Sequence, residues 1–119
     1  MAEQVGVIPT MILDGEALRP TEYQVGSLAE AVIYEPRGVY TVARTFHGDH
    51  ALLLDAHLDR LEESARLSNI PLRLDRTRLR AALRALLREA GFAESRFRIT
   101  VPANDPALLY LAAEPLQQL

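Results

Sequence analysis

The 119-residue sequence contains no cysteine and no lysine, and each absence excludes a class of chemistry. Without cysteine the chain forms no disulfide bond and offers no thiolate nucleophile. All 13 basic residues are arginine, so the chain has no lysine amine with which to form an internal Schiff base with a carbonyl cofactor. Any chemistry that needs such a bond would require another polypeptide segment.

Positive net charge and long apolar runs are also missing. The formal net charge is −3, which gives no electrostatic support for binding a phosphate backbone, so we expect no nucleic-acid partner. No apolar run is long enough to cross a bilayer, and we expect no membrane partner. The first ten residues lack the basic and apolar regions of a secretion signal. The sequence therefore predicts a cytoplasmic location.

About half of the residues, 49%, are hydrophobic, which is typical of a globular domain. The length suits one domain with its own core, and no repeat or linker divides it. We therefore expect a single domain over residues 1–119.

Turn and cap residues divide the chain into strands and helices. The order of these elements predicts an α+β fold, with two helices packed on one side of an antiparallel sheet. The expected elements are two short strands on either side of Asp14-Gly15, a short helix over 28–34 after the cap Ser27, strand 38–46, a return strand within 51–54, a helix from the cap Asp55 to about Asn69, a helix over 76–90 after Asp75, and strands at 95–103 and 107–115.

Strand 38–46, "GVYTVARTF", is rich in β-branched and aromatic residues. Alternation places Tyr40, Val42, Arg44 and Phe46 on one face, and a second face of small and β-branched residues could pack under the helices. A phenol and a guanidinium side by side suit a ligand that carries a carboxylate or a phosphate. An ordinary solvated sheet face would have the same pattern.

The helix that follows carries two stripes. His57, Arg60 and Ser64 recur at helical spacing and form a polar line beside an apolar line that includes Leu58 and Leu61. This arrangement is typical of an amphipathic helix, and it is also what one wall of a binding site would look like.

Other kinds of site have less support. His47, His50 and His57 match no standard zinc spacing, so we expect no metal site. No serine lies in a nucleophile-elbow context, and there is no glycine-rich phosphate loop. The arginines at every fourth position from Arg76 to Arg88 form one face of the last helix, which we interpret as solvated.

The stretches "GVYTVAR", "HLDRLEESA" and "RFRITV" together resemble the N-terminal small domain of the class IV aminotransferases, the pyridoxal-phosphate enzymes of fold type IV. The resemblance runs from about Met11 to Glu114. Its most specific part is the helix motif, in which Arg60, Leu61 and Ser64 match together with Ala65.

The resemblance implies roles for particular residues. Arg60 matches the arginine that binds the cofactor phosphate, and His57 matches a structural histidine that ties the helix to the hairpin. Side chains that line the substrate pocket match Tyr40, Val42, Arg44 and Arg98.

It also implies partners. Pyridoxal phosphate would be the cofactor of a complete protein, which this chain alone would not bind stably. The other partners would be a small amino or keto acid substrate, a C-terminal domain absent from this sequence, and a second copy of the chain. That domain carries the catalytic lysine, so the resemblance implies no catalytic residue here and no activity for the chain alone.

The sequence departs from the family pattern at several points. Thr41 stands where the family strand has glutamate, "YEPRG" replaces the usual residues ahead of that strand, and "VPAND" replaces the usual threonine-arginine-glycine. These departures leave open the substrate and the choice between aminotransferase and lyase chemistry. They also leave open two alternatives: a stand-alone, non-enzymatic module for dimerisation or ligand binding, and an α+β domain whose motifs coincide by chance.

Overall fold

A six-stranded antiparallel sheet organises the structure, a computed structural model that describes residues 6–116. The strands are β1 (Thr10–Asp14), β2 (Ala17–Pro20), β3 (Gly38–Phe46), β4 (His50–Ala51), β5 (Ser95–Pro102) and β6 (Leu108–Pro115), in the spatial order β2-β1-β6-β5-β3-β4. Three helices, α1 (Leu28–Tyr34), α2 (Leu54–Leu67) and α3 (Arg76–Ala90), complete the fold, which confirms the predicted α+β class.

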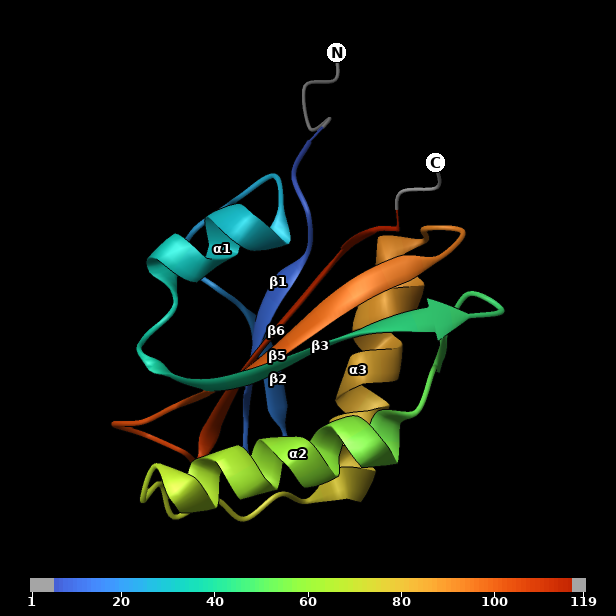
Figure 1. Ribbon diagram of the computed structural model, residues 1–119. Coiled ribbons are helices and arrows are strands. Elements are labelled where there is room, and N and C mark those ends of the chain that lie inside the picture. Colours follow the sequence, from blue (N-terminus) through green and yellow to red (C-terminus); the bar gives the residue numbers. More distant parts are fainter. Residues whose placement is uncertain (1–5, 117–119) are drawn as a thin grey trace.

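The two long helices cover one face of the sheet (Figure 1). Their leucines, such as Leu58 and Leu86, pack against Phe97, Ile99 and other inward-facing strand residues, and all four are fully buried. Burying one such side chain contributes about 1.5–3 kcal/mol, so this layer holds most of the stability. It is the pair of helices on one side that the sequence predicts.

The short helix α1 lies on the opposite face. Its residues Leu28 and Ala31 pack with Ile8, Val25 and Ala112 in a smaller apolar cluster. The hydroxyl of Ser27 accepts a hydrogen bond from the backbone N–H of Glu30, so Ser27 caps α1 as predicted. The sheet therefore separates a large helical core from a smaller face that only α1 covers in part.

The motif "GVYTVAR" begins where β3 approaches β5 closely. Gly38 lies opposite Pro102, and a Cβ atom on Gly38 would overlap the carbonyl oxygen of Val101. Only glycine allows the two backbones to approach in this way. The first residue of the motif therefore has a structural role in the β3–β5 pairing.

Two local predictions are wrong. Asp55 does not cap α2; the helix begins at Leu54, and its N-cap is Leu53, two residues before Asp55, in the left-handed conformation with no side-chain capping bond. The return strand is only His50–Ala51, because Leu52 and Leu53 turn away to enter the helix. A two-residue β4 leaves these two leucines outside the sheet, near Val42 and Arg44 of β3.

Within residues 6–116, no helix is long and apolar enough to cross a membrane.

Candidate functional site

The four predicted substrate residues lie on the sheet face that α1 covers in part. Tyr40, Val42 and Arg44 alternate along β3, and the register of β3 with β5 places Arg98 opposite Val42 and Arg96 opposite Arg44. Residues directly opposite each other on antiparallel strands share a face. The structure therefore brings together the four residues that the sequence separates into two segments, and it adds Arg96.

An open cavity of about 460 Å³ adjoins this face. Its walls are mainly apolar, and the guanidinium groups of Arg44 and Arg96 supply most of its positive charge. The lining residues are Val42, Ala43, Arg44, Leu52, Leu53, His57, Arg96 and Leu116. Such a combination suits a small ligand with an apolar body and an anionic group.

Leu53 is the strained residue of the cavity wall. Its φ is 54°, in the left-handed region that bulky residues rarely adopt, and 68% of the residue is exposed. Left-handed non-glycine residues cluster at functional sites, where the surrounding structure must hold them in place. The loop that holds Leu53 is anchored by a 2.9 Å hydrogen bond from the N–H of Leu52 to the carbonyl of Arg44.

His57 joins α2 to β3. Its Nδ1 lies 3.0 Å from the hydroxyl of Thr41, on the buried face of the strand, and 3.3 Å from Nη2 of Arg60. The guanidinium can only donate, so Nδ1 accepts and the imidazole is neutral in this arrangement. Burial, followed by the positive charge of Arg60, lowers the pKa of His57. The resemblance implied this tie between helix and hairpin.

Arg60 lies next to His57, one of the residues that line the cavity. Its side chain is exposed, and among residues 6–116 it has no carboxylate within ion-pair distance. A guanidinium without an acidic partner suits the phosphate group of a cofactor, to which it can donate two charge-assisted hydrogen bonds. The donor set therefore fits the phosphate end of pyridoxal phosphate, while the lysine that would hold the other end is absent from the sequence.

Arg98 occupies a different environment from Arg44. Its side chain is 10% exposed, its Nε donates to Oε1 of Glu35 at 3.0 Å, and the Tyr40 ring lies 3.9 Å from its guanidinium carbon. The hydroxyl of Thr100 donates to the same Glu35 oxygen at 2.7 Å. Arg98 thus supports the Tyr40 ring and also forms a buried ion pair with Glu35.

Glu35, like Arg96, is a residue of this site that sequence reasoning missed. It directly follows α1, its side chain is only 3% exposed, and 63 residues separate it from Arg98. Burial and then the charge of Glu35 raise the pKa of the nearby Tyr23 to about 12. The one signal in the sequence was "YEPRG", where a charged residue replaces the usual family residue.

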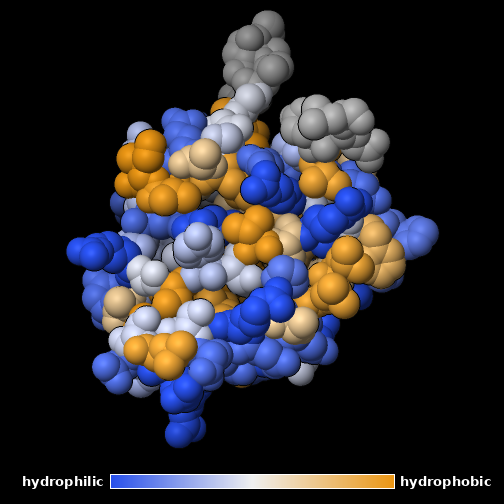
Figure 2. All heavy atoms as spheres, viewed as in Figure 1, coloured by the Kyte–Doolittle hydropathy of each residue, from blue (hydrophilic) through white to orange (hydrophobic). Residues whose placement is uncertain are grey.

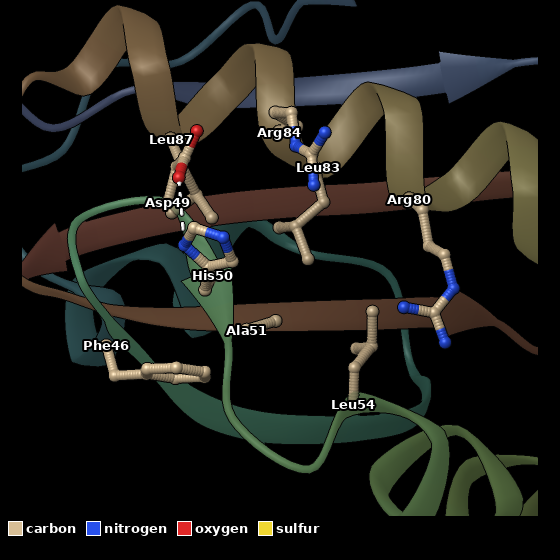
Figure 3. Close-up of a pocket in the computed structure, with 9 residues that line it drawn as sticks. All are labelled: Phe46, Asp49, His50, Ala51, Leu54, Arg80, Leu83, Arg84 and Leu87. Carbon is tan, nitrogen blue, oxygen red and sulfur yellow. Dashed lines mark ion pairs between the residues drawn. The ribbon is translucent and has the colours of Figure 1, made fainter.

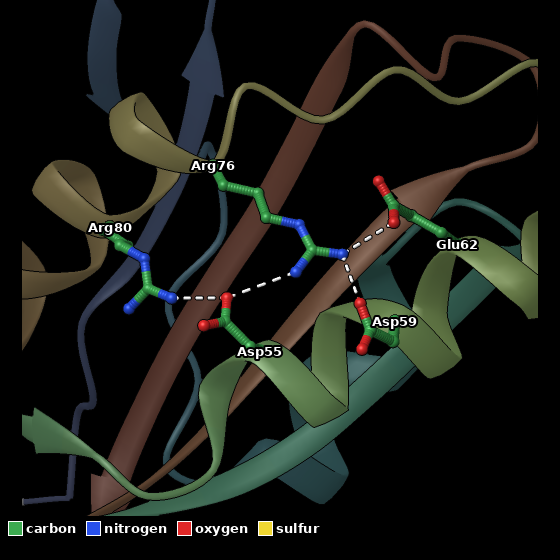
Figure 4. A network of polar contacts seen from close by, with 5 residues as sticks. All are labelled: Asp55, Asp59, Glu62, Arg76 and Arg80. Carbon is green, nitrogen blue, oxygen red and sulfur yellow. Dashed lines mark hydrogen bonds and ion pairs between the residues drawn. The ribbon is translucent and has the colours of Figure 1, made fainter.

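The sequence predicts that the arginine face of α3 is solvated, but in the structure two of its arginines form ion pairs with α2. Arg76 bonds three acids of α2 and Arg80 bonds one of them, so this face clamps the two helices together (Figure 4). The acids are Asp55, Asp59 and Glu62. Side-chain hydrogen bonds from Arg80 lower the pKa of Asp55. The network is structural and lies away from the cavity of Arg44.

A second, smaller cavity of about 170 Å³ lies between the β3–β4 hairpin and α3 (Figure 3). Arg84 and His50 reach its rim, and Asp49 is held by Arg88 at 2.8 Å. Its charged groups are already paired or face solvent. No group of three metal-ligating side chains occurs in the described part of the chain, at this cavity or elsewhere.

The family comparison gives a match over most of the chain. The model of the family described as amino-transferase class IV matches residues 38–118. A search of curated proteins found no match.

Solved structures show the same fold. A putative branched-chain amino acid aminotransferase from Thermotoga maritima superposes with a TM-score of 0.66 at 22% identity, over 92% of this chain and 39% of that one. A hypothetical aminotransferase from Mycobacterium tuberculosis gives 0.62 at 25%, over 91% and 40%. The T.th. branched-chain amino acid aminotransferase complexed with N-(5'-phosphopyridoxyl)-L-glutamate gives 0.62 at 21%, over 97% and 42%. The chain spans about two fifths of the length of these proteins.

The environment of His57 predicts a pH-dependent stability. Because its pKa is lowered in the folded state, the unfolded chain binds the proton more readily. The free energy of unfolding should therefore fall as the pH drops from about 7 through the ordinary histidine pKa of about 6.5, and this contribution should level off below the folded pKa. Urea unfolding between pH 7.5 and 5 measures it.

The His57→Asn variant should lack this decline, and the control His47→Asn, in the hairpin turn, should retain it. An equal slope in wild type and His57→Asn would show that the His57 ring is not held neutral.

Proposed function

The chain belongs to the class IV aminotransferase family, and we propose that it forms the small domain of a pyridoxal-phosphate-dependent protein of that family. In this role it contributes cofactor-phosphate and substrate contacts to amino-group transfer or to lyase chemistry, and it is inactive alone. The observation that supports the proposal is the contact of Arg60 with His57, which lines the same cavity as Val42 and Arg44.

Arg60 anchors the cofactor phosphate in this proposal. Its stem leaves α2 beside the buried Leu61, and its guanidinium is exposed next to His57. Since the imidazole of His57 accepts from both Arg60 and Thr41, it orients the guanidinium without neutralising its charge. The phosphate dianion therefore meets a positioned, fully charged donor.

The substrate lies along β3 in the same proposal. Arg44 holds a carboxylate at the cavity, while Val42 and the exposed ring of Tyr40 contact the body of the substrate. Arg98 takes part by supporting the Tyr40 ring through a cation–π contact. The apolar walls from Leu52 and Leu53 favour a substrate with an apolar portion.

The chemistry itself requires more than this chain. Pyridoxal phosphate, when bound, supplies the electron sink that lets an amino group leave or join a carbon atom. This sequence has no lysine to hold the cofactor covalently, so we propose that a lysine-bearing domain completes the site. The 119 residues supply binding and orientation, and the amino or keto acid substrate is a partner of the completed protein.

A homo-oligomer is also part of the proposal. Three consecutive residues of α1, Val32, Ile33 and Tyr34, are exposed by 46%, 76% and 53%, and Figure 2 shows hydrophobic side chains gathered over this helix. A contiguous apolar surface of this kind disfavours contact with water, and we propose that a second copy of the chain covers it.

Light scattering at micromolar concentration should therefore report a dimer or larger species. Ile33→Ser should shift the population toward monomer, while Leu67→Ser, on the equally exposed end of α2, should not. A monomer throughout the concentration range would remove self-association from the proposal and would leave only the lysine-bearing domain as the partner of this surface.

Arg60 gives the most direct test of the cofactor contact. Because only part of the site is present, the chain should bind pyridoxine 5′-phosphate weakly, near the millimolar range of about −4 kcal/mol. This probe lacks the aldehyde and cannot react with the N-terminal amine. Arg60→Gln should reduce the affinity about tenfold, as the loss of one charge-assisted contact predicts. Nuclear magnetic resonance (NMR) titration measures it.

Arg73→Gln serves as the control, since Arg73 is an exposed residue beyond α2, and pyridoxine without phosphate should not bind. Arg60→Gln should change the free energy of unfolding by less than about 0.5 kcal/mol, as is usual for exposed positions. Unchanged affinity in Arg60→Gln, or a large loss of stability, would make Arg60 a structural residue. The proposed contact between Arg60 and the cofactor phosphate would then be wrong.

A further inference from the structure

The face that carries the proposed site holds three guanidinium groups in neighbouring positions. Arg96 and Arg98 lie two residues apart on β5, and Arg44 lies opposite Arg96 on β3. Glu35 pairs with Arg98 at 3.0 Å, and Glu114 lies 3.8 Å from Arg96. Among residues 6–116, Arg44 has no carboxylate partner; its Nε donates to the backbone carbonyl of Thr45. The face therefore keeps one positive charge in excess.

The Glu35 carboxylate is fixed deep in this face. Its backbone N–H caps α1 by donating to the carbonyl of Ala31 at 3.1 Å, and Pro36 follows it directly. Oε1 accepts from Arg98 Nε and from the Thr100 hydroxyl at 2.7 Å. A carboxylate buried to this degree is retained only when it is paired and hydrogen-bonded, and both conditions are met here.

The positive charge of Arg98 is consequently already balanced by Glu35. Its Nε is bonded to Glu35, one face of its guanidinium lies on the Tyr40 ring, and only 10% of the side chain is exposed. A second carboxylate brought to Arg98 would also lie beside the negative charge of Glu35, which repels it. Arg44, by contrast, is exposed and lines the open cavity.

We propose that Glu35 is a specificity-determining residue: its carboxylate occupies Arg98, so the face binds one ligand carboxylate at Arg44 and rejects a second one at Arg98. The inference rests on the proposed function, because it assumes that this face binds the substrate. It assigns the site to amino or keto acids with a single carboxylate on the part of the molecule that meets this face.

The experiment compares glutarate with its monomethyl ester, two ligands of the same length that differ in one carboxylate. Both are titrated into the ¹⁵N-labelled chain while the Nε–H signals of the arginines are followed by NMR. In wild type, both ligands should move the Arg44 signal, neither should move Arg98, and their affinities should agree within about threefold.

The variant Glu35→Gln removes the negative charge beside Arg98, so the charge of that guanidinium is no longer balanced. Glutarate should then gain about tenfold over its ester, the size of one added charge-assisted contact, and its binding should move the Arg98 signal. Glu63→Gln is the matched control, because it removes the same charge from an exposed residue of α2 and should leave the ratio of affinities unchanged.

Three results would overturn the inference. Wild-type chain that binds glutarate tenfold more tightly than the ester, with a moving Arg98 signal, contradicts it even if Glu35→Gln does not fold. A folded Glu35→Gln with an unchanged ratio contradicts it as well. If neither ligand moves the Arg44 signal, the proposed function fails together with the inference. If the ligands move the Arg44 signal and one of the first two results is found, only the role of Glu35 is contradicted.

Discussion

The pairing of β3 with β5 is the constraint on which the rest of the structure depends. It runs over seven residue pairs, from Gly38 opposite Pro102 to Arg44 opposite Arg96, and it decides which side chains face the helices. Ala43 and Phe97 point into the helical core, while Val42 and Arg98 point to the other face. A slip of β5 by one residue would turn its side chains over and bring Arg96 and Arg98 under α2 and α3.

The two faces of the paired strands β3 and β5 have different physical roles. On the helical face, apolar burial supplies stability, and the arginine network of α3 links that helix to α2 at its edge. On the other face, charge is concentrated and then nearly balanced by Glu35 and Glu114. Thr41 connects the two, because it lies on the helical face and yet holds His57, which lines the cavity and contacts Arg60.

Local patterns in the sequence predicted most of the fold. Ser27 and Asp75 were identified as caps from their position before apolar periodicity, and both accept the expected backbone hydrogen bond. The alternation of Tyr40, Val42 and Arg44 follows from the strand period alone. These features depend on neighbours within a few residues, so one sequence is enough to show them.

The features that sequence reasoning missed depend on distant neighbours or on unusual backbone. Asp55 looks like a cap, but it is drawn into ion pairs with Arg76 and Arg80, and Leu53 starts the helix in a conformation that leucine rarely adopts. The pairing of Glu35 with Arg98 exists only because α1 packs on β6, the neighbour of β5 in the sheet, which no local pattern reveals.

The register of β3 with β5 can be measured directly. Cross-strand nuclear Overhauser effects of the ¹⁵N,¹³C-labelled chain in solution report which backbone atoms lie opposite one another. The structure predicts contacts that pair Val42 with Arg98 and Tyr40 with Thr100, which places the arginines of both strands on one face. A pattern that pairs Val42 with Phe97 or Ile99 would contradict this register, and the residues of the proposed site would then not share one face of the sheet.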